Sequence, residues 1–123
     1  MDTQEIPREQ WKSFFDSFSR QHEGWLATLE VFADFGAQPE AEELPFEGIS
    51  LESNDGDSDS VIISFGRSPD DHVTHTIQQP TQLWLQQTPE GADASLEIRA
   101  KDNSNTLLRF RSPVLPEFVD GVV

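Results

Sequence analysis

The 123-residue chain has no cysteine, no tyrosine and only two lysines, Lys12 and Lys101. Without cysteine it can form no disulfide bond, no thiolate nucleophile and no metal centre with cysteine ligands. No apolar run approaches the roughly 18 residues that a membrane-spanning helix needs. The acidic, polar N-terminus is unlike a signal peptide. We therefore expect a soluble cytoplasmic protein that does not insert into a membrane.

Basic residues are also scarce, since 8 stand against 23 acidic ones and give a formal net charge of -15. Proteins bind phosphate backbones and anionic lipids chiefly through lysine and arginine. Nucleic acids and membranes are therefore excluded as partners. A surface this acidic keeps a protein solvated, and it also attracts basic proteins electrostatically.

The length and the aromatic content predict one domain over residues 1–123, with a core built from nine phenylalanines and three tryptophans. A helix is expected over residues 7–23, because Pro7 suits a first turn and Gly24 a C-terminal stop. Four aromatic residues on one helical stripe predict that it packs on a sheet: Trp11, Phe14, Phe15 and Phe18.

Residues 25–111 are rich in β-forming segments and contain no second helical pattern. The segments are 25–33, 47–53, 60–66, 72–78, 82–88, 95–101 and 106–111. Without helices to form crossovers, the sheet should be mainly antiparallel. We expect an α+β fold in which the N-terminal helix packs on about seven strands that curl into a partly closed small β-barrel. The clearest hairpin covers residues 95–111.

Four stretches, "EIPREQW", "FFDSFSRQHEGWLATLEV", "DDHVTHTI" and "LLRFRSPVLPE", resemble a bacterial family catalogued as domain of unknown function 5335. The resemblance spans nearly the whole chain. It implies no activity, no cofactor and no catalytic residue, so the functional interpretation rests on the residues themselves.

The stretch "DDHVTHTI" holds two of the three histidines, His72 and His75. Its β-branched residues favour a strand, whose side chains alternate between faces, so the two rings cannot chelate one metal ion. His75 shares its face with Val73 and is expected to be half-buried as a structural residue. Either histidine remains a candidate for ligand binding. Asp70 and Asp71 are expected in the preceding turn.

Three aspartates with odd spacing, Asp55, Asp57 and Asp59, form a weak candidate calcium site. An EF-hand loop counted from Asp55 would need glycine and glutamate where Ser60 and Gly66 stand. A polar hairpin loop explains the same residues.

Half of the basic residues gather near the C-terminus, at Arg99, Lys101, Arg109 and Arg111. One interpretation is that the arginines neutralise the acidic surface. The other is that their forked guanidinium groups bind a carboxylate or phosphate ligand beside a histidine.

No motif for a nucleophile, a phosphate loop, a dinucleotide or a zinc protease is present. The leading hypothesis is a non-catalytic interaction or assembly module without a cofactor, which binds a protein partner or forms a homodimer. The alternative is a small-anion-binding protein or hydrolase that uses His72 or His75 with Arg99, Arg109 and Arg111. The apolar segment 112–123 is expected to dock on the sheet near a self-association surface.

Overall fold

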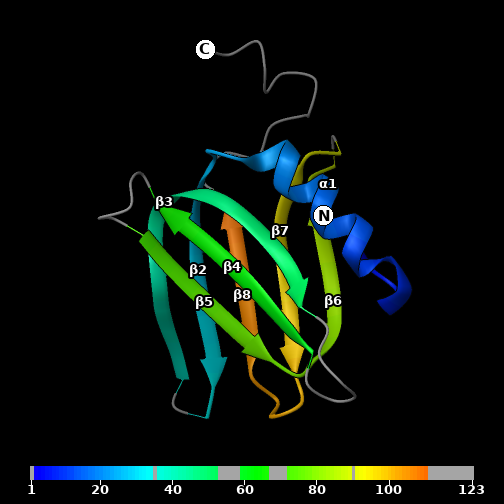
Figure 1. The fold of residues 1–123 in the computed structure, drawn as a ribbon, viewed down its shortest axis with the longest axis vertical. Coiled ribbons are helices and arrows are strands. Elements are labelled where there is room, and N and C mark those ends of the chain that lie inside the picture. Colours follow the sequence, from blue (N-terminus) through cyan, green and yellow to red (C-terminus); the bar gives the residue numbers. More distant parts are fainter. Residues whose placement is uncertain (1, 35, 53–58, 67–71, 90, 111–123) are drawn as a thin grey trace.

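The structure is a computed structural model that describes residues 2–34, 36–52, 59–66, 72–89 and 91–110 (Figure 1). Its elements are β1 (Asp2–Glu5), a 3-10 turn η1 (Arg8–Gln10), α1 (Trp11–His22), β2 (Leu26–Ala33), β3 (Gly36–Glu52), β4 (Ser60–Gly66), β5 (His72–Gln78), β6 (Pro80–Gln87), β7 (Asp93–Ala100) and β8 (Asn105–Phe110).

The strands form one sheet in the order β1-β6-β7-β8-β2-β3-β4-β5, and every neighbouring pair is antiparallel. The long strand β3 belongs to both halves of this sheet. Its first half pairs with β2 as far as Pro45, and its second half pairs with β4 from Phe46 onward. Figure 1 shows β3 curving over the top of the molecule, so that β4 and β5 lie diagonally in front of the other strands.

One hydrophobic core joins the helix to both halves of the sheet. Helix α1 contributes Trp11, Phe15, Phe18 and His22 as its buried residues. The ring of Phe46, at the bend of β3, lies 6.0 Å from that of Phe18 and 5.8 Å from that of Phe110 on β8. The helix therefore packs where the two halves of the sheet meet.

A serine of α1 also covers the edge of β3 that faces away from β4. Ile49 lies on the half of β3 that has left β2, and Ser19 Oγ accepts a hydrogen bond from Ile49 N (2.9 Å) and donates one to Ile49 O (3.0 Å). A buried strand edge needs such partners, because unpaired backbone groups are costly away from water. Ser19 thus substitutes for a neighbouring strand at this position.

The predicted α+β fold with one helix on an antiparallel sheet is confirmed. The 95–111 hairpin is confirmed as well, with Leu96 directly opposite Leu108. The partly closed barrel is not confirmed, because within the described ranges the sheet ends at β1 and β5 without joining them. The docking segment predicted at 112–123 lies outside the described residues.

About seven strands were expected, and the described residues form a sheet of eight. The polar strand β1 was missed, and β3 was expected to begin near residue 47 rather than at Gly36. The first half of β3 contains proline, alanine and glutamate, which disfavour strands. Pairing with β2 outweighs those local preferences.

We expect Phe18→Ala to lower the free energy of unfolding by about 3–5 kcal/mol, the usual cost of truncating a buried aromatic side chain. Phe18 is 2% exposed and lies within the core. Phe14→Ala is the matched control on the same helix, and its cost should be clearly smaller because Phe14 is only partly buried. Urea unfolding measures both changes, and equal losses in the two variants would contradict this placement.

Candidate functional site

His22, in the last turn of α1, is the most enclosed titratable side chain at the junction of helix and sheet. Only 1% of the residue is exposed. Its ring stacks on Phe110 at 4.7 Å between centroids, meets Trp25 edge-on at 4.5 Å and lies 4.2 Å from Phe18. An imidazole in such an aromatic cage needs polar partners for both of its nitrogens.

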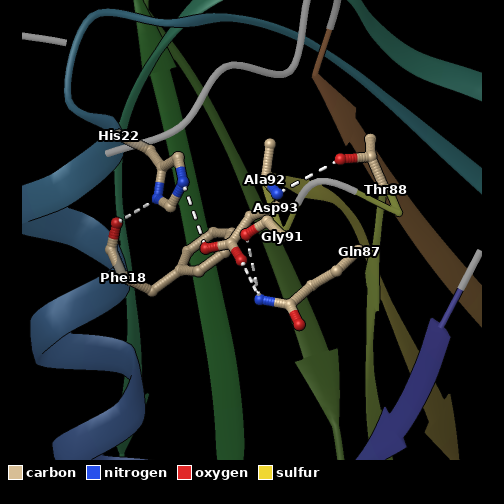
Figure 2. A network of polar contacts seen from close by, with 7 residues as sticks. All are labelled: Phe18, His22, Gln87, Thr88, Gly91, Ala92 and Asp93. Carbon is tan, nitrogen blue, oxygen red and sulfur yellow. Dashed lines mark hydrogen bonds and ion pairs between the residues drawn. The ribbon is translucent and has the colours of Figure 1, made fainter. Parts of the chain in front are cut away.

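Both partners are present, as Figure 2 shows. His22 Nδ1 lies 2.8 Å from Phe18 O, and Nε2 lies 3.3 Å from Asp93 Oδ2. Gln87 Nε2 donates a hydrogen bond of 2.9 Å to Asp93 Oδ1. A carbonyl oxygen can only accept, so Nδ1 of His22 carries a proton and donates it to Phe18 O, while Nε2 faces Asp93.

The surroundings of Asp93 determine the direction in which its pKa shifts. Burial alone would raise the pKa of Asp93, but hydrogen bonds from His22 and Gln87, together with the charge of His22, outweigh it and lower the pKa below 3.8. Asp93 is therefore a carboxylate at neutral pH, and its Oδ2 faces Nε2 of His22 in the interior. This buried polar contact joins α1 to β7.

A β-bulge turns Asp93 toward the helix. In the β6–β7 ladder Ser95 lies opposite Gln86, but Asp93 lies opposite Gln87, so Ala94 is an extra residue without a partner. Side chains alternate along a regular strand, which would place Asp93 on the same face as Ser95. The extra residue reverses that alternation and directs the carboxylate inward.

The turn that follows β6 is fixed by its own hydrogen bonds. Thr88 N donates to Ala92 O (2.9 Å), and Ala92 N donates to Thr88 Oγ1 (3.2 Å). Gln87 Nε2 also lies 3.5 Å from Gly91 O. These bonds hold the side-chain amide of Gln87 in place, and that amide donates to Asp93.

This contact between His22 and Asp93 has a structural role. Both ring nitrogens of His22 are engaged and the side chain is only 2% exposed, so no face of the imidazole is left for a substrate. Sequence reasoning missed both residues. His22 could have been found, because it continues the buried helical positions 11, 15 and 18 at the next i+4 step. Asp93 could not, because its orientation depends on the bulge.

His72 and His75 lie on opposite faces of β5, as the strand alternation predicts. His72 is exposed, and its Nε2 lies 2.6 Å from Glu47 Oε1. His75 is half-buried and faces the interior. Burial lowers the pKa of His75, and the nearby charge of Glu40 opposes that effect only partly, so the ring is neutral at physiological pH.

The ring of His75 lines a cavity of about 260 Å³ between β5 and the ends of β2, β7 and β8. The other lining residues are Val31, Ala33, Thr76, Ile77, Gln78, Ala100, Asp102, Ser104 and Thr106. A second cleft of about 530 Å³ shares Ala33, Asp102 and Ser104 with it and extends to Phe32 and Asp34. Hydrogen bonds from Ser104 lower the pKa of Asp102, which is therefore a carboxylate. The two spaces adjoin and have negatively charged walls.

Of the three candidate arginines, the two within the described residues lie elsewhere. Arg99 is exposed and packs over the ring of Trp84 at 5.3 Å, with Nε 3.3 Å from Asn105 Oδ1. Arg109 forms an ion pair with Glu30. Neither arginine lines the cavity that contains His75, and Arg111 lies outside the described residues. The predicted grouping of a histidine with these arginines is not assembled in the described part of the chain.

Two of the three aspartates of the candidate calcium site, Asp55 and Asp57, lie outside the described residues. Asp59 forms an ion pair with Arg8. In the part of the chain that is described, no group of three histidine, aspartate or glutamate side chains could hold a metal ion. The described helices include none that is long and apolar enough to cross a membrane.

The model of a family of unknown function, DUF5335, matches residues 2–117 of the chain. The protein belongs to DUF5335. The resemblance inferred from the four sequence stretches is therefore confirmed. An uncharacterized protein of Aquifex aeolicus (strain VF5) is 30% identical over 119 residues, which cover 95% of this chain and 100% of the relative. No solved structure matches the chain.

In this DUF5335 protein, Asp93→Asn should lower the free energy of unfolding at pH 7 by about 1–3 kcal/mol, since it removes the carboxylate that satisfies His22. The folded-state pKa of Asp93 lies below its ordinary value of 3.8. The carboxylate therefore stabilises the fold above pH 3.8, and this contribution disappears as the pH falls through the folded-state pKa. Urea unfolding at several pH values should show the two proteins converging in acid.

Asp16→Asn, at an exposed position on α1, is the matched control and should change little. A double-mutant cycle with His22→Gln isolates the pair, because the cost of Asp93→Asn should be much smaller once His22 is absent. A cost that is independent of both pH and His22 would show that Asp93 acts through something else.

Proposed function

We propose that this DUF5335 protein is a non-catalytic cytoplasmic interaction module that binds a basic protein partner. One observation carries the proposal: β3 has five exposed carboxylates and no basic residue over Gly36–Glu52. These are Glu40, Glu42, Glu43, Glu47 and Glu52.

The first half of β3 exposes three of these charges to solvent, those of Glu40, Glu42 and Glu43. Of the eight residues from 36 to 43, Ala41 alone is buried. Carboxylates held close together on a rigid hairpin repel one another, and a partner bearing lysine or arginine relieves that repulsion. Such complementarity accelerates association and makes it sensitive to salt.

The alternative of an anion-binding protein or hydrolase has less support. Arg99 and Arg109 bind other side chains on the outer face, away from His75. The described carboxylates beside His75 also disfavour an anionic ligand there. An interaction role therefore accounts better for the distribution of charge.

The test replaces Glu40 and Glu42 by glutamine and compares this variant with one in which the exposed Glu9 and Glu23 are replaced. Both variants lose two negative charges, but at different places. Carboxyl-to-amine cross-linking in an extract of the native cell, followed by mass spectrometry, identifies the bound protein. We expect wild type and the Glu9/Glu23 variant to retain one basic partner, and the Glu40/Glu42 variant to retain at least tenfold less of it.

Equal retention by all three proteins would contradict a role for β3. Equal loss in both variants would show that only the total charge matters.

A further inference from the structure

The two edges of the sheet are protected to very different extents. β1 has four residues, two of them acidic, and β5 has seven residues without any lysine, arginine, aspartate, glutamate or proline. Natural edge strands are usually short, charged or interrupted by proline, since a regular edge pairs readily with another chain. β5 has none of these features, and its outer edge pairs with no described strand.

Backbone donors and acceptors point outward along this edge. Gln79 N donates to Asp59 O at 2.9 Å, and the register continues with Ser60 opposite Gln78. Residues in an antiparallel ladder alternate between bonding to the neighbour and facing away from it. The N–H and C=O groups of Thr74 and Thr76 are therefore directed to the free edge.

A cavity that could take a side chain lies beside that edge. The cavity of about 260 Å³ separates residues 75–78 of β5 from Val31 and Ala33 of β2. Figure 1 shows β5 crossing in front of β2 and β8. A strand added to β5 would direct every second side chain into this cavity. The neutral ring of His75 lines the cavity and makes no hydrogen bond to another described residue.

The cavity walls favour a basic side chain. Asp102 lies between the cavity and the adjoining cleft, Asp34 lines the cleft, and Glu40 is close enough to act on His75. The cleft also includes Phe32, which is 37% exposed. The methylene stem of a lysine or arginine can pack on such a ring while its charge reaches the carboxylates.

We propose that β5 accepts an extended basic segment of a partner protein as an additional strand, with a lysine or arginine side chain entering the cavity beside His75 and reaching the adjoining cleft. The proposal rests on the interaction function above and names the site at which the partner binds. Main-chain hydrogen bonds supply affinity, and the cleft supplies the preference for a basic residue. A second copy of the chain fits less well, because each copy carries a net charge of -15.

The probe is a capped octapeptide of alternating lysine and valine. Two control peptides replace lysine by glutamate, or carry N-methyl groups on alternate amides so that they cannot form a ladder. In NMR titrations of the full chain we expect the lysine peptide to shift the Thr74 and Thr76 amide signals and to slow their hydrogen exchange at least tenfold. Both control peptides should bind at least tenfold more weakly.

A matched pair of variants separates strand addition from general attraction to an acidic surface. Thr76→Pro removes an amide that points to the free edge of β5 and leaves the ladder with β4 intact. Thr3→Pro makes the same change on β1, where the bond from Ile6 N to Leu83 O (2.9 Å) and the β1–β6 register direct Thr3 outward. We expect Thr76→Pro to weaken peptide binding at least tenfold and Thr3→Pro to leave it unchanged.

Equal binding to both variants, or equal binding of the N-methylated peptide, overturns the proposal. The N-methylated peptide gives this answer even if Thr76→Pro fails to fold. Slow exchange of the Thr74 and Thr76 amides without peptide overturns it as well, because the edge is then already covered by the chain itself. A dimer that is detected by light scattering and abolished by Thr76→Pro also overturns the proposal, because the strand added to β5 then comes from a second copy of the chain.

The cellular partner distinguishes the two proposals. If the Glu40/Glu42 variant loses that partner and Thr76→Pro retains it, the interaction function stands and strand addition at β5 is wrong.

Discussion

The buried contact between His22 and Asp93 is a polar link between the helix and the sheet. It joins the last turn of α1 to β7, while Ser19 joins the preceding turn to β3. The two contacts therefore tie one short helix to both halves of a sheet that bends at Phe46. Buried polar groups are costly unless they are hydrogen-bonded. Here Phe18 O bonds to the ring of His22, and Gln87 bonds to Asp93, so the contact between helix and sheet leaves these groups satisfied.

The sequence predicts the parts of this fold that depend on local pattern. The aromatic spacing places the helix, and period-two segments place β4, β5, β7 and β8 close to their observed bounds. Features that depend on pairing could not be predicted. The first half of β3 is a strand because β2 lies beside it, and Asp93 faces inward because Ala94 is bulged. Neither cause leaves a signal within a short window of sequence.

The candidate sites follow the same division. Strand alternation separates His72 from His75 correctly, because that geometry needs only a regular strand. Arg99 and Arg109 are close in the sequence but do not line a common cleft with His75. The β7–β8 hairpin directs both side chains to its outer face. The cavity beside His75 could not be predicted, because residues from four strands meet there only when the sheet curls without closing.

An open sheet also explains why one histidine can be half-buried without a hydrogen-bonding partner among the described residues. In a closed barrel, a strand beside β5 would cover its edge and fill the space next to His75. Instead, β5 leads through Gln79 directly into β6, whose first residue pairs with Ala100 on β7. In the described part of the sheet, β5 therefore lies across the cavity from β2 rather than beside it. The unpaired edge of β5 and the polar cavity lie side by side, because both result from a sheet that does not close.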